Sequence, residues 1–251
     1  MKAGLDRHNA EIQRNRAAWQ KKPLLRRIYA GFYERIMRQI DPGIPGAVVE
    51  IGSGIGNLKS RLPAAITTDL FPNPWLDLVC DGYELPFRNA AVSHLVLFDV
   101  FHHLEMPMAF LAEARRVLVP EGRLILFEPY ISAASLPVYG LLHPEPLAMK
   151  EPINIGSEAP ARRRYYAAQG NATRLFFRRE GPESWPPGWR MLHREAFSGF
   201  SYLLSGGYSR PAFYPYAWVG LLLRLDQVLS AWPRLFAARC LVVLQREPSG
   251  P

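Results

Sequence analysis

The sequence predicts an α/β protein with a mostly parallel sheet, and two observations support that fold class. First, residues 48–51 form a short apolar run, as buried parallel strands do, and they lead directly into Gly52, Gly54 and Gly56. Second, further short apolar runs alternate with helical patterns and turn signals. Glycine permits tight turns with positive φ and brings main-chain N–H groups close to a ligand. We therefore expect a nucleoside cofactor at this turn.

The elements after the turn follow in chain order. We expect a short helix over residues 57–62, with its N-terminal end directed towards the ligand. Three apolar runs predict the next strands, at residues 65–69, 76–82 and 94–98. Apolar residues at helical spacing predict a helix over residues 110–118, and Pro120 and Gly122 terminate it. A fifth strand then follows at residues 123–129.

The sequence indicates a single domain over residues 1–251 with four consecutive parts. These are an N-terminal helical cap (1–45), a cofactor-binding core (46–130), a substrate lid insertion rich in Pro, Arg and aromatic residues (131–190) and a C-terminal part (191–247). The prolines of the lid exclude long helices there. In the C-terminal part we expect a strand over residues 193–204, an amphipathic helix over 218–229 and a last strand over 239–246.

The arrangement Glu50-x-Gly52-x-Gly54-x-Gly56 resembles the first motif of class I S-adenosylmethionine-dependent methyltransferases. A dinucleotide-binding turn places its third glycine three residues after the second, so the shorter spacing here disfavours a nicotinamide oxidoreductase. The resemblance covers about residues 46–130 and is to the small-molecule group that includes quinone and natural-product methyltransferases. It implies a Rossmann-like, seven-stranded, mostly parallel sheet with helices on both faces and an antiparallel last strand. It also implies S-adenosyl-L-methionine as the cofactor.

The resemblance implies roles for residues at the ends of the first four strands. Glu50 would face the methionine amino end, Asp69 the ribose and Asp81 the adenine amino group. The other residues expected to contact the cofactor are Gly52, Ser53, Gly54 and Gly56 of the turn, Leu70 and Gly82 beside the adenosine, and Phe98 through its backbone.

Polar side chains after the fourth strand are the candidates for catalysis. If the acceptor is a hydroxyl group, a base that removes its proton accelerates the transfer. Asp99 and His103 are the catalytic candidates, although a histidine here can instead bond to the backbone and order the turn. His102 is a weaker candidate, and Glu128, which precedes Pro129, is expected to order the loop. No metal ligands are expected.

The net charge and the clusters of basic residues indicate which kinds of molecule the protein could bind. The formal net charge is +8. Basic residues gather at Arg14, Arg16, Lys21, Lys22, Arg26 and Arg27, and again at Arg162, Arg163, Arg164, Arg174, Arg178 and Arg179. Such clusters favour an anionic or lipid-linked small molecule, or peripheral contact with a membrane, unless they are simply solvated. Nucleic acid is disfavoured, because no zinc-ligand spacing or RNP-type motif is present.

Neither a membrane-length apolar run nor a signal peptide is visible, and the two cysteines lie in strand-like runs, so we expect a cytoplasmic protein. The sequence thus predicts a methyltransferase that acts on a small-molecule acceptor, such as a phosphorylated or lipid-linked glycan or a quinone-like phenol. The alternative is a non-catalytic module that binds S-adenosylmethionine as a partner or regulator. The acceptor, the methylated atom and the oligomeric state stay open.

Overall fold

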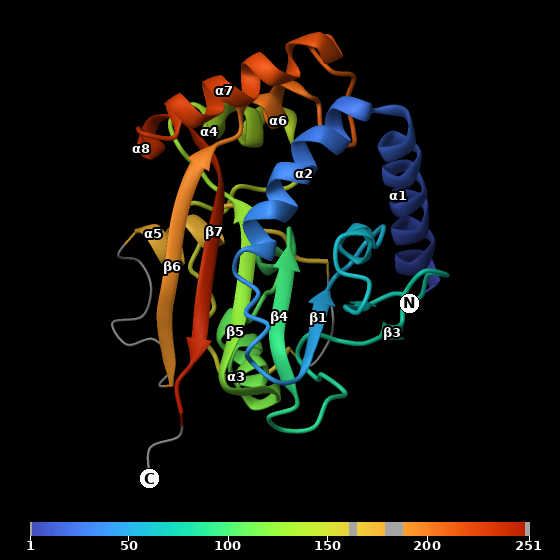
Figure 1. Cartoon of the computed structure of the whole chain (residues 1–251), viewed down its shortest axis with the longest axis vertical. Helices are drawn as coiled ribbons and strands as arrows, with labels where there is room; N and C mark the ends of the chain where they lie inside the picture. Colours follow the sequence, from blue (N-terminus) through green and yellow to red (C-terminus); the bar gives the residue numbers. More distant parts are fainter. Residues whose placement is uncertain (1, 161–164, 179–187, 249–251) are drawn as a thin grey trace.

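The fold was analysed in a computed structural model that describes residues 2–160, 165–178 and 188–248. Its centre is a seven-stranded sheet with the order β3-β2-β1-β4-β5-β7-β6 (Figure 1). The strands are β1 (Ala47–Ile51), β2 (Ile66–Asp69), β3 (Leu78–Val79), β4 (Val92–Phe98), β5 (Leu118–Pro129), β6 (Trp189–Ser198) and β7 (Ala237–Arg246). Strands β1 to β5 pair in parallel, whereas β7 runs antiparallel to both β5 and β6. The predicted Rossmann-like fold is confirmed.

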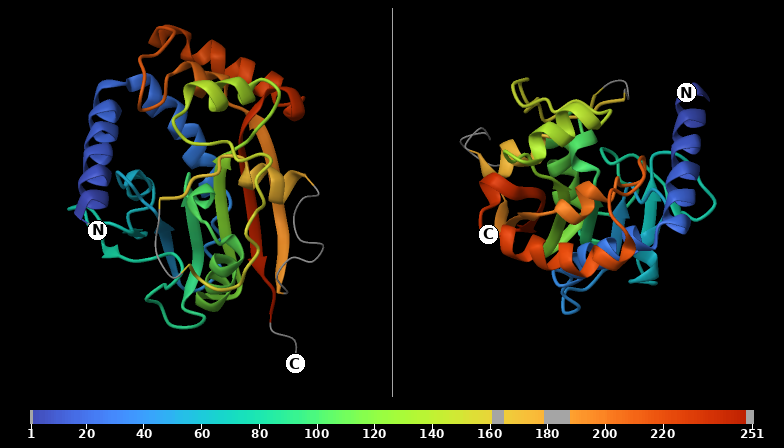
Figure 2. Two further views of the ribbon diagram at one scale, coloured as in Figure 1. Left: turned by 180° about the vertical axis from the view of Figure 1, so that it is seen from behind. Right: turned by 90° about the horizontal axis from the view of Figure 1, so that it is seen from above.

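Successive side chains of a strand point to opposite faces of the sheet, and here both faces are buried. On one face α2 (Pro23–Met37) packs against β4, β5 and β7 through residues such as Val96, Ile125 and Val243. On the other face α3 (Pro107–Val117) and α5 (Asn171–Phe177) pack against the alternate positions. Figure 2, which includes a view from behind, shows these helices on opposite sides of the sheet. Burial on both faces explains why the central strands are continuous apolar runs.

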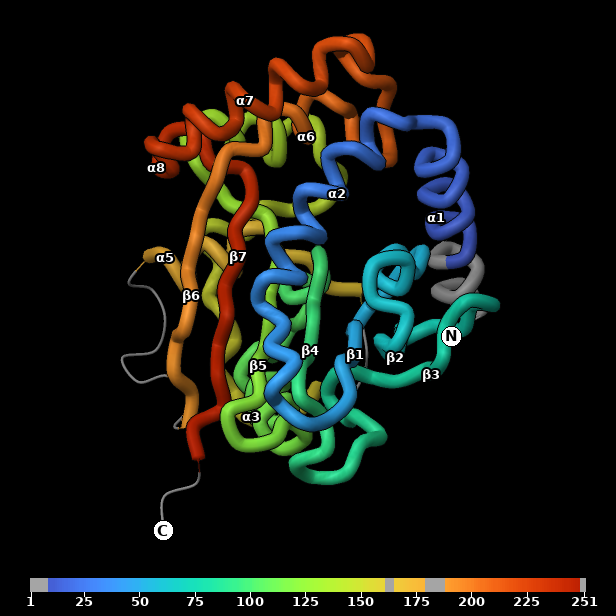
Figure 3. The backbone as a smooth tube through the Cα atoms, in the orientation of Figure 1, coloured from blue at the N-terminus to red at the C-terminus, as the bar shows by residue number. Residues whose placement is uncertain are grey.

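The N-terminal helices stand at the same end of the molecule as the glycine turn. Helix α1 (Lys2–Lys21) lies beside the β2–β3 edge of the sheet, as the tube in Figure 3 shows. The side chain of Ile12 in α1 approaches Gly54, because a Cβ built on that glycine would lie 3.8 Å from Ile12 Cδ1. The cap therefore reaches the turn that we expect to hold the cofactor.

The segment between β5 and β6 contains only short helices within its described residues, namely α4 (Ser135–Pro137), the π-helical turn η3 (Val138–Leu142) and α5. The C-terminal part contains α6 (Phe200–Leu204), η4 (Tyr216–Trp218), α7 (Val219–Leu229) and α8 (Pro233–Phe236). Helices α7 and α8 lie at the top of the molecule, above β6 and β7 (Figure 1). The boundaries of the predicted cap, core, lid and C-terminal part stay predictions.

Three of the expected elements are shorter than predicted. The strand expected over 76–82 forms only β3 (Leu78–Val79). The helix expected over 57–62 is a single 3-10 turn, η1 (Asn57–Ser60), because Pro63 follows closely and disfavours helical continuation. The strand expected over 193–204 ends at Ser198, and α6 follows it. The carboxylate of Asp226 accepts hydrogen bonds from the backbone N–H groups of Phe200 (2.7 Å) and Ser201 (3.2 Å), and so stabilises the start of that helix.

Of the second predicted basic cluster, the structure describes only Arg174 and Arg178, and Arg178 is exposed. Arg174 is buried and donates hydrogen bonds to the carbonyl groups of Ala148 and Glu151, so it ties the lid segment together. Residues 162–164 and Arg179 lie outside the described residues. Within the described ranges, no helix combines the length and the apolar character that crossing a membrane requires.

Candidate active site

The turn after β1 depends on glycine. Gly52, Gly54 and Gly56 have φ values of 68°, 53° and 72°, in the region that side chains disfavour. A Cβ on Gly52 would lie 2.5 Å from Val100 Cγ2, whereas the space above Gly54 is open apart from Ile12. Ser53 links the turn to β2, because its backbone N–H donates to the carbonyl of Thr68 (2.8 Å). The turn thus leaves room for a ligand at Gly54.

Glu50 is a buried carboxylate next to this turn. It is 2% exposed, and its Oε2 has no hydrogen-bond partner within the described residues. Burial, with a smaller contribution from the nearby Asp69, raises the pKa of Glu50 to about 8, although a hydrogen bond with Ser53 opposes the shift. A buried polar oxygen without a hydrogen-bond donor is energetically costly. The amino group of a ligand would supply the donor that Oε2 of Glu50 lacks.

The residues predicted to hold the adenosine follow β2 and β3 at the same edge of the sheet. Asp69, at the end of β2, accepts a hydrogen bond from the backbone N–H of Gly54 (3.0 Å). Leu70 beside it is 43% exposed. Asp81 accepts from the backbone N–H of Tyr83 (2.9 Å), and a Cβ on Gly82 would lie 3.5 Å from Phe110. The two carboxylates are thereby fixed on either side of the turn that leads out of β2.

Trp75 is a contributor that the sequence analysis did not identify. Its indole N–H donates to the carbonyl of Gly54 (2.8 Å), and its ring lies against Gly56. The guanidinium group of Arg16 in α1 lies 4.7 Å from the centre of the ring. The tryptophan therefore connects the glycine turn to the N-terminal cap.

Asp99, one of the two catalytic candidates, is paired with a buried arginine. Its Oδ1 lies 2.5 Å from Nη2 of Arg239, which is 2% exposed and begins the apolar part of β7. Burial raises the pKa of Asp99, while Arg239 opposes that shift. Four aromatic rings surround the guanidinium group at 4.9–5.6 Å, those of Phe32, Phe98, Phe127 and Tyr202. The lone arginine in an apolar strand was the sequence signal for this pair.

Phe98, the expected backbone contact, lies at the end of β4 and packs its ring against that of Phe127, with centroids 4.6 Å apart. Glu128 of β5 orders the turn that follows β4, as the sequence predicted. Glu128 Oε1 accepts from the backbone N–H groups of Val100 (2.9 Å) and Phe101 (2.7 Å). Its Oε2 lies 2.6 Å from Nδ1 of His102. The turn η2 (Phe101–His103) is thus held by one buried carboxylate.

The two histidines of η2 have different environments. Burial alone would lower the pKa of His102, but Glu128 and Glu145 raise it to about 10. Burial lowers the pKa of His103, and the neighbouring His102 lowers it further. Nδ1 of His103 lies 2.9 Å from the carbonyl oxygen of Tyr166, so this nitrogen carries the hydrogen in the neutral ring. The lone pair of His103 is therefore on Nε2.

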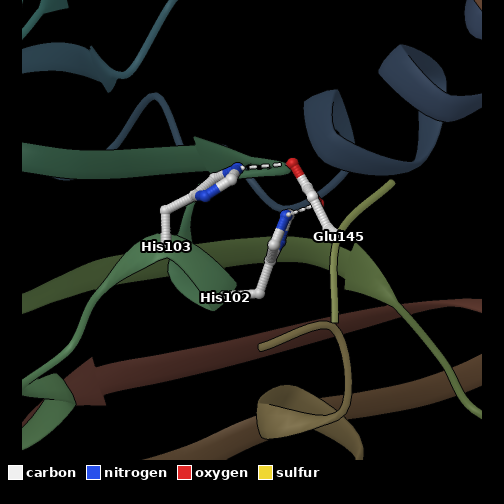
Figure 4. Close-up of side chains that lie close together, drawn as sticks. All are labelled: His102, His103 and Glu145. Carbon is white, nitrogen blue, oxygen red and sulfur yellow. Dashed lines mark ion pairs between the residues drawn. The ribbon is translucent and has the colours of Figure 1, made fainter. Parts of the chain in front are cut away.

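Glu145, from the segment after η3, completes this group. Figure 4 shows its carboxylate directed at both imidazole rings. Its oxygens lie 3.4 Å from Nε2 of His102 and 3.6 Å from Nε2 of His103. No pattern in the sequence indicates Glu145, because this residue is distant from the histidines along the chain and lies among prolines in an irregular segment.

Comparison with known proteins identifies the domain and the fold. Residues 49–126 match the family model described as a methyltransferase domain. No curated protein matches the chain. At these low identities, similar solved structures show the fold alone. A chain in the complex between the Haloferax volcanii Trm112 methyltransferase activator and a protein described as a methyltransferase has a TM-score of 0.56 and 17% identity, and 98% of both chains is covered.

Two further solved structures match the chain at lower identity. The [4+2]-cyclase SpnF has a TM-score of 0.50 and 12% identity, with 87% of this chain and 80% of that chain covered. The geranyl diphosphate C-methyltransferase from Streptomyces coelicolor has a TM-score of 0.49 and 10% identity, with 88% and 80% covered. Residues 49–126 are therefore a methyltransferase domain, and the seven-stranded sheet around them has the fold of the class I methyltransferases, which use S-adenosylmethionine as the cofactor.

Proposed function

We propose that the chain is an active enzyme that transfers the methyl group of S-adenosylmethionine to an oxygen atom of a small-molecule acceptor. The observation that carries this proposal is the unpaired, buried Oε2 of Glu50 beside an open glycine turn. The bound cofactor supplies a methyl group on a positively charged sulfur that is already a good leaving group. The protein therefore has to bind the cofactor and the acceptor, orient them towards each other and exclude water from the site.

The polar groups of the site fit such a cofactor. Glu50 would accept a hydrogen bond from its amino group, and Asp69 would accept from the ribose hydroxyls. Asp81 would meet the adenine, with Leu70 and Gly82 beside it. Each of these groups lies at the carboxyl edge of β1, β2 or β3, where ligands bind in open α/β sheets.

His103 is the better supported of the two candidates for a general base. Its pKa is lowered and its lone pair is on Nε2, so near neutral pH it can accept a proton. Asp99 is already paired with Arg239, and proton transfer to it would break that ion pair. We therefore assign the proton acceptor role to His103 and a positioning role to Asp99.

The surface of α7 and α8 favours a lipid-linked acceptor over a soluble phenol. Six apolar side chains recur at helical spacing there and are 41–66% exposed: Trp218, Leu221, Leu225, Val228, Trp232 and Leu235. Arg224 and Arg234 are exposed on the same helices. Asp226 is the one acidic residue between positions 211 and 235, and it is buried.

We call the six side chains the α7–α8 face, and we propose that it rests on an anionic lipid surface. Apolar and aromatic side chains flanked by arginines suit the interface between lipid head groups and acyl chains. The face lies above β6 and β7, at the end of the molecule towards which the parallel strands point (Figure 1). A phosphorylated, lipid-linked glycan combines the negative charge and the apolar anchor that this surface suits.

The non-catalytic alternative has no observation in its favour. Glu50, the glycine turn and Asp69 are all present, which supports binding of the cofactor. His103, whose pKa is lowered, follows β4, the strand that pairs with β1. Turnover, and not cofactor binding alone, distinguishes the enzyme from such a module.

Two assays test the proposal. Purified protein is incubated with S-adenosylmethionine and either polyprenyl phosphate sugars in vesicles or water-soluble phenols, and S-adenosylhomocysteine is measured. We expect turnover with the lipid-linked acceptors and a large loss of it in H103A, whereas H193A, which changes a half-buried histidine of β6, keeps full activity. Turnover with phenols alone would contradict the acceptor class, and no turnover with any acceptor would favour the binding module.

Flotation with vesicles that contain an anionic phospholipid tests the surface. Changing Leu221 and Val228 together to Glu should release the protein from the vesicles, because two charges then enter the α7–α8 face. Gln227→Glu adds a charge at another exposed position of α7 and serves as the matched control. Equal binding of the double variant and the control would refute a role for this face.

A further inference from the structure

The contacts between Glu145 and the two histidines have an unusual length. His102 Nε2 and His103 Nε2 lie 3.4 Å and 3.6 Å from the carboxylate oxygens of Glu145. Charge-assisted hydrogen bonds are shorter, at about 2.7–2.9 Å, and on its other side His102 does make one of 2.6 Å with Glu128. The three side chains point towards a common centre, but they lie too far apart for short hydrogen bonds between them. Their ligand atoms all lie within 4.8 Å.

This spacing matches the geometry of a metal site. A tetrahedral Zn²⁺ ion with bonds of about 2.0–2.1 Å to nitrogen and oxygen holds its ligand atoms about 3.3–3.4 Å apart. The distances of 3.4 Å from His102 Nε2 to Glu145 Oε2 and 3.6 Å from His103 Nε2 to Glu145 Oε1 are close to that separation, and each histidine faces its own oxygen of the carboxylate. Two imidazoles and one carboxylate also form a ligand set that zinc binds in proteins, with one coordination position left open.

The atoms that do not face the centre of the group are already engaged. Nδ1 of His102 is bound to Glu128, and Nδ1 of His103 to the carbonyl of Tyr166, so each ring has its Nε2 directed inward. A carboxylate or a carbonyl behind the ring is the usual support of a metal-binding histidine. Glu145 is supported too, because Tyr165 donates to its Oε1 (3.1 Å) and Gln169 to its Oε2.

We propose that His102, His103 and Glu145 bind a Zn²⁺ ion, and that its fourth coordination position takes the acceptor oxygen. The oxygen part of this inference rests on the proposed function. Bound to zinc, the acceptor hydroxyl becomes more acidic and releases its proton to water. The oxygen then bonds to the methyl carbon as the carbon–sulfur bond breaks, and the electron pair stays on the sulfur of S-adenosylhomocysteine. In this form of the enzyme His103 is a ligand, and the metal performs the activation otherwise assigned to it.

Magnesium fits the group less well, because it prefers oxygen ligands in an octahedron. The competing interpretation contains no metal. In it, a protonated His102 lies between Glu128 and Glu145 and only orders the lid segment against η2. The two interpretations differ in what the protein binds, and a direct titration separates them.

The test uses the whole chain after dialysis against a chelator. Zn²⁺ is titrated by calorimetry, and Co²⁺ is added to a second sample to record the absorption bands of a tetrahedral site. We expect one Zn²⁺ per chain and tetrahedral Co²⁺ bands. Affinity should fall at least roughly 100-fold in H103A and in E145Q, which keeps the size of the side chain.

The matched control is H193A, because His193 Nε2 lies 3.5 Å from Glu195 Oε2 without a third ligand. Its zinc affinity should equal that of the wild type. Circular dichroism confirms that each variant is folded. Absence of stoichiometric Zn²⁺ binding in the wild type, or equal binding in E145Q, would overturn the proposal. Calorimetry with S-adenosylhomocysteine on the same samples separates the two hypotheses: cofactor binding without zinc binding refutes the metal site alone.

Discussion

Replacing Glu50 by Gln should remove a specific pH dependence of cofactor binding. The pKa of Glu50 is about 8 in the cofactor-free protein. The carboxyl is therefore only about 1% ionised at pH 6 and about half ionised at pH 8. If the ionised form binds the protonated amino group of the cofactor, whose ordinary pKa is about 7.8, the affinity follows the product of the two fractions.

That product rises about 20-fold between pH 6 and pH 8, which corresponds to about 1.8 kcal/mol. Binding at pH 7 should also release about 0.8 protons per cofactor, because Glu50 loses a proton and the amine takes up a small fraction of one. In E50Q the affinity is lower, the rise between pH 6 and pH 8 is absent, and no proton is released from this position.

Calorimetry with S-adenosylhomocysteine, in two buffers of different protonation enthalpy, measures both the affinity and the released protons. E195Q is the control, since Glu195 pairs with Arg35 on the surface of β6, away from the glycine turn. A pH profile of the wild type as flat as that of E50Q would refute the contact between Glu50 and the amine.

The same shift affects stability with a defined sign. Since the pKa of Glu50 is raised on folding, the folded protein binds the proton more tightly than the unfolded chain does. The stability of the cofactor-free protein should therefore fall as the pH rises from about 4.5 to about 8. E50Q should lose this decrease, which denaturant unfolding across that pH range measures.

Three further outcomes are expected. Asp69→Ala should weaken cofactor binding tenfold or more in calorimetry, because it removes a charged acceptor worth about 1.5–3 kcal/mol, and unchanged affinity would remove Asp69 from the ribose. Gly54→Val should abolish cofactor binding, since a β-branched side chain would occupy the open space at a φ of 53°, whereas Gly31→Ala in α2, with nothing within 4 Å, should leave binding intact. The pKa of the buried His94 is lowered by burial to about 4, so stability should fall by about 1–2 kcal/mol as the pH drops from about 6.5 to about 4, and thermal melts of His94→Gln should show a smaller decrease.

The features that the sequence predicted are local ones. The glycine turn and Glu50 lie within seven residues, and the strand that carries them is a continuous apolar run. The acid at the end of β2 was equally visible, because parallel strands end at one edge of the sheet. These features needed no knowledge of how distant segments meet.

The features that were missed depend on contacts between segments that are far apart in the sequence. Glu145 reaches the two histidines across more than forty positions, and Arg239 reaches Asp99 across 140 positions. The end of β6 was placed too late because Asp226, in a later helix, starts α6 through its carboxylate. Long-range polar contacts of this kind leave no periodic pattern in the sequence.

The most direct test of the central claim is calorimetric titration of the purified protein with S-adenosylmethionine and S-adenosylhomocysteine, with NAD as the control. We expect micromolar binding of both sulfur nucleosides, one per chain, and no binding of NAD. Preference for NAD, or binding of neither sulfur nucleoside at pH 8, where Glu50 is half ionised, would contradict the assignment of this site.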